Sequence, residues 1–359
     1  MIDVRPVLIM AGGTGGHVFP ALAVADELRM RGIPVIWLGT KAGIESRLVP
    51  QAGYPIEWMS ISGLRGKNTL TLILAPLRLL VACWQALAVL LKRKPCAVLG
   101  MGGFASGPGG LMAWLIRKPL LVHEQNAIPG LTNKVLARLA TVVLQAFPAV
   151  FKQAVTTGNP VRKSICEIAK PEDRYAQRQG NLHLLVIGGS LGAVKLNEII
   201  PQALAKIDRD KRPQVIHQTG LNNIESAKTI YSDAGVDAKV EAFIDDMPAV
   251  YEWADLVICR SGAMTVFELA AAGVASILVP YPYAVDDHQT QNARYLEAAE
   301  AAIIKQQDAL SADWVAEVIE DFSVNRKKLL DMAVAARKLA MPDSAKTIAD
   351  ACSSAGGMV

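Results

Sequence analysis

The sequence is poor in cysteine, and its few cysteines form no motif. There are five, an odd number, at scattered positions: Cys83, Cys96, Cys166, Cys259 and Cys352. None stands in a CxxC spacing, so a reducing cytosol fits the chain, whereas a disulfide scaffold or a zinc site does not. A signal peptide is not expected either, because the first apolar run, from Val7 to Ala11, is short and stops at Gly12.

Two common nucleotide-binding signatures are also missing. The sequence has no GxxxxGK[ST], which argues against a P-loop protein, and no GxGxxG, which weakens a nicotinamide-dependent oxidoreductase. What is present suits a large folded protein. Apolar residues make up 52% of the 359 residues and charged residues 19%, enough to bury the cores of two domains.

Charge is distributed unevenly along the chain. Residues 1–160 hold 16 Lys and Arg but only 6 Asp and Glu, a net charge of +10, whereas residues 161–359 carry −6. The basic half therefore suggests an anionic partner, such as an anionic lipid, a phosphorylated substrate or a nucleic acid. No nucleic acid is expected, because this half shows no aromatic and basic platform.

A strand, a glycine-rich turn and a helix recur along the sequence. The apolar run 7–10 leads into AGGTGGH at 11–17, and the run 184–187 leads into GGSLG at 188–192. Fully apolar strands that alternate with helices predict parallel sheets covered on both faces. We expect an α/β protein with two Rossmann-like domains, 1–160 and 161–339, joined near TTGNPVR and facing each other across a cleft. The last helix, about 340–359, can pack back on the first domain.

The first glycine loop offers backbone N–H groups at a helix N-terminus, where an anion or sugar hydroxyls can bind; a tight packing turn is the alternative. His17 begins that helix, whose positive end disfavours an imidazolium. A neutral histidine there suits a general base, although a structural hydrogen bond fits equally well. The second loop adds the hydroxyl of Ser190, and a diphosphate is the expected ligand.

Two further polar stretches follow apolar strands. HEQN at 123–126 stands at the expected carboxyl end of a strand, where ligands bind in such sheets, but a network within the loop fits as well. Glu268 can hold the two hydroxyls of a ribose. However, Thr265 and Glu268 also match a capping box, which the residues alone favour.

Residues 69–94 form the most apolar stretch, interrupted by Pro76, Arg78 and Gln85. These interruptions disfavour a membrane span. An amphipathic helix that ends in Lys92-Arg93-Lys94 fits better, and an apolar face with a basic rim is typical of a protein lying on an anionic membrane. An ordinary buried helix is the alternative.

Taken together, these stretches resemble the MurG family of UDP-N-acetylglucosamine: N-acetylmuramyl-(pentapeptide) pyrophosphoryl-undecaprenol N-acetylglucosamine transferases. The segments that carry the resemblance occur in family order and cover essentially the whole chain: GGTGGHVFPALAVA, SGLRGK, GMGGFASGPGG, HEQNAIPGLTN, GNPVR, GGSLGA, FIDDM, RSGAMTVFELAAAG and HQTQNA.

The resemblance implies a GT-B architecture and an inverting hexosyltransferase of peptidoglycan synthesis, and so of cell shape and division. Its donor would be UDP-N-acetylglucosamine and its acceptor undecaprenyl-linked lipid I, giving lipid II. It also implies donor contacts at Thr14, Gly15, Gly16, Asn126, Arg162, Ser190, Ile244 (through its backbone), Ala263, Met264, Thr265, Val266, Phe267, Glu268 on the ribose, and Gln289, with His288 as the alternative to Gln289.

For the reaction we expect direct displacement at the anomeric carbon by the acceptor's 4-hydroxyl. His17 is the first candidate for the base and Glu124 the second. No cofactor or metal is expected to be required, because loop N–H groups and helix dipoles can stabilise the leaving diphosphate. The enzyme would be peripheral, at the cytoplasmic face of the bacterial inner membrane, and other cell-wall synthesis proteins are its candidate partners.

Two other functions compete with transfer at this stage. One is a UDP-sugar epimerase of the same fold, which needs no membrane face. The other is a non-catalytic membrane-docking scaffold, which would bind the UDP-sugar without transferring it.

Overall fold

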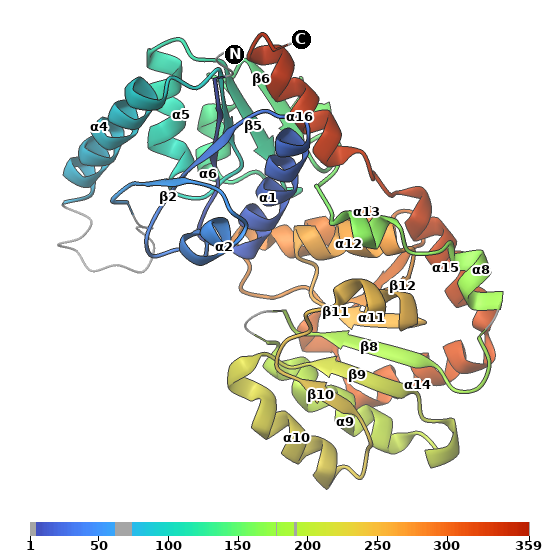
Figure 1. Ribbon diagram of the computed structural model, residues 1–359. Helices are drawn as coiled ribbons and strands as arrows, with labels where there is room; N and C mark the ends of the chain where they lie inside the picture. The colour runs from blue at the N-terminus through green and yellow to red at the C-terminus, as the bar shows by residue number, and fades with distance from the viewer. Residues whose placement is uncertain (1–4, 62–73, 177, 190–191, 359) are drawn as a thin grey trace. The chain divides into compact units, whose positions relative to one another are not determined.

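A computed structural model describes residues 5–61, 74–176, 178–189 and 192–358 of the chain. Its internal contacts divide the chain into two compact units (Figure 1). Unit 1 comprises residues 1–161 and 341–359, and unit 2 comprises residues 162–340. The chain therefore leaves unit 1 once and returns to it for its last segment.

Unit 1 is built on a seven-stranded parallel sheet in the order β3-β2-β1-β4-β5-β6-β7. The strands are β1 (Val7–Met10), β2 (Val35–Gly39), β3 (Ile56–Trp58), β4 (Ala97–Gly100), β5 (Leu120–Glu124), β6 (Val142–Gln145) and β7 (Val155–Thr156). The helices are α1 (Gly15–Met30), α2 (Glu45–Gln51), α4 (Ala75–Arg93), α5 (Ser106–Leu115), α6 (Leu131–Leu136) and α16 (Ser344–Ala355). The strands β1, β2, β4 and β5 are fully buried, because helices cover both faces of the sheet.

The last helix belongs to the first sheet. In Figure 1, α16, in red, runs beside α1, in blue, although more than 300 residues separate them in sequence. Ile348, Ala349 and Cys352 are buried in the core that also holds α1 and β1. Arg31 at the end of α1 pairs with Asp350 at 2.5 Å.

Unit 2 repeats the plan with six parallel strands in the order β10-β9-β8-β11-β12-β13. The strands are β8 (His183–Ile187), β9 (Gln214–Gln218), β10 (Lys239–Glu241), β11 (Leu256–Cys259), β12 (Ala275–Leu278) and β13 (Ala302–Ile304). The helices are α7 (Lys163–Cys166), α8 (Pro171–Ala176), α9 (Val194–Lys206), α10 (Ile224–Asp233), α11 (Met247–Trp253), α12 (Ala263–Ala272), α13 (His288–Glu297), α14 (Ala312–Val324) and α15 (Arg326–Lys338).

In both sheets the strand order reverses next to a glycine loop. β1 pairs with β2 on one side and β4 on the other, and β8 pairs with β9 and β11 in the same way. The crevice beyond the carboxyl ends of such strands is where open α/β sheets bind ligands. The loop 11–14 and the glycines Gly188 and Gly189 lie at these two switch points, so the sequence prediction of Rossmann-like domains is confirmed.

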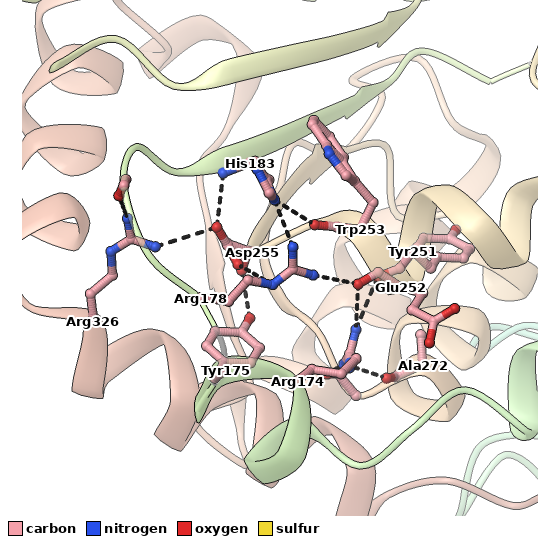
Figure 2. A network of polar contacts seen from close by, with 12 residues as sticks. Arg174, Tyr175, Arg178, His183, Tyr251, Glu252, Trp253, Asp255, Ala272 and Arg326 are labelled. Carbon is pink, nitrogen blue, oxygen red and sulfur yellow. Dashed lines mark hydrogen bonds and ion pairs between the residues drawn. The ribbon is translucent and has the colours of Figure 1, made fainter. Parts of the chain in front are cut away.

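A polar network fixes the opposite end of the sheet in unit 2 (Figure 2). The Asp255 carboxylate, only 1% exposed, accepts a hydrogen bond from the His183 N–H at 2.8 Å and pairs with Arg178 and Arg326, each at 3.3 Å. Arg174 is also buried, and it donates to backbone carbonyls at Tyr251 and Ala272. The network therefore ties α8 and α15 to the strands from the side away from the glycine loop.

We expect Asp255→Asn to lower the free energy of unfolding of the protein by about 1–3 kcal/mol, because two arginines lose their buried counter-charge. Urea unfolding, followed by tryptophan fluorescence, measures the change. Asp321→Asn is the matched control, since Asp321 pairs with Lys328 at the surface and its substitution should change the free energy of unfolding little. Equal effects of the two substitutions would contradict the assignment.

Candidate active site

A buried carboxylate holds the first glycine loop of unit 1 in place through hydrogen bonds. Glu45, fully buried, accepts hydrogen bonds from the N–H of Gly13 at 3.0 Å and from the N–H and hydroxyl of Thr40 at 3.0 and 2.7 Å. A Cβ at Gly12 would lie 2.5 Å from this carboxylate, so the loop requires glycine there. The N–H of Gly13 is thus already bonded to Glu45.

The remaining N–H groups of this loop stand at the start of α1. The first helical hydrogen bonds run from the N–H groups of His17 and Val18 to the carbonyl of Thr14. Gly15 and Gly16 precede them, so their N–H groups point out of the helix end, as an anion or a hydroxyl requires. Thr14 and Gly16 are exposed and Gly15 partly so. The backbone therefore suits the ligand contacts predicted at these positions.

A second glycine pair, after β4, packs on the first loop. Gly102 and Gly103 have φ of 93° and 84°, which side chains rarely adopt. A Cβ at Gly103 would lie 2.4 Å from the carbonyl oxygen of Gly12, and a Cβ at Gly102 would lie 2.8 Å from Nδ1 of His17. The glycines of GMGGF are thus explained by the close approach of two loops and of the histidine ring.

His17 is partly exposed, and its ring is tied to the loop after β5. Its Nδ1 lies 2.9 Å from Oε1 of Gln125. Asn126, the other predicted donor contact in that loop, is also partly exposed. The structure therefore brings the end of β5 next to the start of α1, as the expected site at this edge requires.

Glu124, the second candidate for the base, is occupied by its own loop. Its carboxylate accepts hydrogen bonds from the N–H groups of Asn126 at 2.9 Å and Gly130 at 3.1 Å and from the side chain of Asn133 at 2.9 Å. The side chain is 1% exposed. This geometry is that of a loop anchor, and it favours His17 as the group that meets a substrate.

In unit 2, α12 begins directly beyond β11. Its N-cap is Gly262, and Thr265 lies inside the first turn, so Thr265 does not cap the helix. The capping box that the residues alone favoured is therefore wrong, because the helix starts three residues earlier than that motif requires. This frees the carboxylate of Glu268 for another role.

The Glu268 side chain is partly buried, and neighbouring groups shift its pKa. The hydroxyl of Tyr251, on α11, donates a hydrogen bond to its carboxylate at 3.2 Å. Burial raises the pKa of Glu268 above its usual value, while the nearby Arg162 and the Tyr251 hydroxyl act to lower it. A carboxylate in this position gains from further hydroxyl donors, which a ribose supplies.

The other predicted residues of unit 2 differ in what they expose. Met264 and Thr265 are partly exposed, whereas Ala263, Val266 and Phe267 are buried. The N–H of Val266 donates to the carbonyl of Gly262, and the side chains of Val266 and Phe267 are buried. The expectation that the segment 263–268 holds the nucleotide therefore stays a prediction for these three buried residues.

Three further predictions concern loops of unit 2. Ile244 lies between β10 and α11 with its side chain buried, and Phe243 beside it is exposed. The predicted contact of Ile244 with the uracil would therefore be made by its backbone. Gln289, in the first turn of α13, accepts from the N–H of Tyr281 at 2.9 Å, and His288 bonds to the Val285 carbonyl. Ser190 lies outside the described residues.

Sequence reasoning missed several residues that hold this site. Glu45 and Tyr251 belong to no motif, so nothing in the sequence linked Glu45 to the first glycine loop or Tyr251 to Glu268. Arg260 donates to the carbonyls of Val279 and Pro280 at 3.0 and 3.1 Å, which orders the segment before Gln289. Its place directly after an apolar strand was the signal that could have found it.

Two Rossmann-like units, each with a glycine loop at its switch point, have the architecture of the GT-B glycosyltransferases. Family models agree: the glycosyltransferase family 28 N-terminal domain matches residues 7–145, and the family 28 C-terminal domain matches residues 183–348.

Comparisons with individual proteins narrow the class. The chain is 52% identical to the UDP-N-acetylglucosamine–N-acetylmuramyl-(pentapeptide) pyrophosphoryl-undecaprenol N-acetylglucosamine transferase of Nitrosomonas europaea, over 98% of this chain and 99% of that protein. It is 54% identical to the transferase of the same name from Nitrosococcus oceani, over 96% and 97%. The crystal structure of Acinetobacter baumannii MurG superposes with a TM-score of 0.86 at 40% identity, covering 98% of this chain and 99% of that one. The chain therefore belongs to the MurG family of N-acetylglucosamine transferases.

Proposed function

We propose that this enzyme transfers N-acetylglucosamine from UDP-N-acetylglucosamine to the 4-hydroxyl of the N-acetylmuramyl unit of lipid I, forming lipid II. Membership of the family, over nearly the full length of its relatives, is the observation that supports this most strongly. The expected readout is labelled N-acetylglucosamine moved from UDP to a lipid I analogue. Release of free sugar or epimerised donor, without labelled lipid, would contradict the proposal.

Unit 2 is the donor-binding unit in this proposal. Glu268 accepts the ribose hydroxyls, the backbone at Ile244 meets the uracil, and Met264 and Thr265 offer the free start of α12 to the diphosphate. Arg162 adds positive charge near Glu268. Gln289 contacts the sugar hydroxyls through its amide nitrogen, because its amide oxygen accepts from Tyr281. Ser190 is a further contact to the UDP-sugar in this proposal.

Unit 1 receives the acceptor and begins the reaction. Nε2 of His17 takes the proton of the acceptor's 4-hydroxyl while that oxygen bonds to the anomeric carbon. The bond from this carbon to the diphosphate breaks, and UDP leaves with the electron pair of that bond. Because the hydroxyl attacks from the face opposite UDP, the configuration at the anomeric carbon is inverted. Thr14, Gly15, Gly16 and Asn126 contact the sugars or phosphates in this proposal. We assign no metal or other cofactor to these steps; N–H groups stabilise the leaving charge.

Helix α4 supplies the membrane face. Within the described residues, it is the one helix long and apolar enough to cross a membrane by length and composition. Yet Ala82, Ala86 and Leu90 pack it onto the core of unit 1. Other side chains of α4 and of the neighbouring α5 are apolar and exposed: Leu77, Leu79, Leu80, Val81, Trp84, Leu91, Trp114 and Leu115.

Such a helix lies on a bilayer rather than through it, with basic residues at its rim. Lys92 and Arg93 at this rim also form ion pairs within unit 1, because both pair with Glu57, at 3.2 and 2.6 Å. We propose a peripheral position at the cytoplasmic face of the inner membrane, where lipid I and other cell-wall synthesis proteins are at hand.

We expect the double substitution Leu80→Ser and Trp84→Ser to weaken binding to anionic phospholipid vesicles at least about tenfold, since each side chain loses apolar burial of roughly 1.5–3 kcal/mol at most. Vesicle co-sedimentation at low salt measures it. Both side chains are exposed, at 67% and 71%, so the fold should be retained. Leu221→Ser, on an equally exposed leucine of unit 2, is the control, and unchanged binding of the double variant would move the membrane face elsewhere.

A further inference from the structure

A series of hydrogen bonds runs from His17 into the core of unit 1. Nδ1 of His17 lies 2.9 Å from Oε1 of Gln125, and Nε2 of Gln125 lies 3.0 Å from Nδ1 of His123. Nε2 of His123 then lies 3.1 Å from the carbonyl oxygen of Gly158. Across the residues that the structure describes, Nε2 of His17 has no hydrogen-bond partner. The series therefore ends in a backbone carbonyl on one side and in the candidate base on the other.

The buried end sets the direction of the first bond. A carbonyl oxygen can only accept, so Nε2 of His123 carries a proton. The hydroxyl of Thr157, 3.2 Å from the same nitrogen, gives its own proton to the Gly158 carbonyl at 2.9 Å and so also accepts. Burial lowers the pKa of His123 to about 4, so the ring is neutral near pH 7. Its Nδ1 is therefore a hydrogen-bond acceptor.

The orientation of the Gln125 amide follows, and a second contact fixes it independently. The amide nitrogen donates to Nδ1 of His123, and it also lies 3.2 Å from the backbone carbonyl of His123, which can only accept. The amide oxygen must then face His17. Since that oxygen accepts, Nδ1 of His17 carries the proton and Nε2 carries the lone pair.

We infer that Gln125 and His123 are positioning residues that hold His17 in the tautomer whose Nε2 can accept a proton. Without them, a histidine in water favours the opposite tautomer, in which Nε2 is blocked. Gly102 completes the arrangement, because only a residue without Cβ leaves room for the ring at this angle. The inference rests on the proposed function for its consequence, although the tautomer itself can be observed without any reaction.

Nitrogen-15 NMR of the full-length enzyme with labelled histidine measures the tautomers directly at pH 7.5. We expect His17 with a protonated Nδ1 and a bare Nε2, and His123 with the reverse; His17→Gln and His123→Gln variants assign the signals. In Gln125→Leu, which keeps the size of the side chain but neither hydrogen bond, His17 should shift toward the tautomer with a protonated Nε2. A wild-type His17 already protonated at Nε2 would overturn the inference.

Activity provides the second measurement. Gln125→Leu should lower kcat about 10- to 100-fold, as the loss of an orienting partner does elsewhere, with KM for UDP-N-acetylglucosamine unchanged. Gln125→Glu still accepts from Nδ1 of His17 but cannot donate to His123, so it should restore part of the kcat that Gln125→Leu loses. Gln145→Leu is the matched control: Gln145 is also buried at the end of a neighbouring strand, but it bonds to Phe151 and Thr156 instead. Its kcat should match the wild type.

The outcomes separate the two levels of the argument. A tautomer that shifts in Gln125→Leu while kcat stays at the wild-type value would overturn the positioning role and leave glycosyl transfer intact. A loss of kcat in Gln145→Leu equal to that in Gln125→Leu would reduce the effect to packing and would also overturn it. A wild-type enzyme with the expected tautomers but no transfer would instead contradict the proposed function.

Discussion

Replacing His17 by alanine should lower kcat about 10²- to 10⁴-fold, the usual contribution of a positioned general base. The affinity for UDP-N-acetylglucosamine should stay close to that of the wild type, because the donor is assigned to groups of unit 2 and to loop backbone. Steady-state transfer to a soluble lipid I analogue, with donor binding measured by calorimetry, separates the two effects. The loss falls on kcat since the proton moves only in the transition state.

The variant His17→Gln is the matched comparison. Its amide can still bond to Gln125, so it keeps the loops in place, but it is not a base. It should be as slow as His17→Ala, and thermal unfolding should match the wild type. Full turnover in either variant would remove His17 from the base role, and a large loss of donor affinity would make it a binding residue instead.

The fold was predictable because its signals are local. Apolar runs such as 7–10 and 184–187, each followed by a glycine loop, predicted buried parallel strands, and the structure confirms the fold class. His17 was also visible, since it lies in the first turn of the helix that follows the first loop. Periodicity and turn residues act over a few positions, so one sequence is enough to read them.

What failed depended on contacts distant in sequence. The Thr265 pattern predicted a cap, but the helix began at Ala263 because Gly262 ends the turn after β11. Glu45 reaches Gly13 across 32 residues, and Tyr251 reaches Glu268 across 17. Neither partner has a motif, because a supporting carboxylate or hydroxyl needs only the right position in space. Such residues become visible only once the sheets bring them together.

Glu268→Gln should raise Kd for UDP-N-acetylglucosamine about 10- to 150-fold, which corresponds to the roughly 1.5–3 kcal/mol of hydrogen bonds to a charged group. The amide oxygen of glutamine still accepts a hydrogen bond but carries no charge. The amide nitrogen cannot accept a hydrogen bond from the second ribose hydroxyl. Isothermal titration at pH 7.5 measures the change. An unchanged Kd would move the ribose away from Glu268.

The pH dependence of this affinity gives a sharper measurement. Burial raises the pKa of Glu268, and only the carboxylate accepts from both hydroxyls, so wild-type Kd should rise as pH falls through that raised pKa. The donor keeps its own charge there, because its diphosphate is esterified at both ends. Glu268→Gln should lack this acidic limb. Tyr251→Phe removes a hydrogen bond that lowers the pKa of Glu268, so it should move the limb to higher pH. A limb that stays in place in Tyr251→Phe, or persists in Glu268→Gln, would assign the titration to another group.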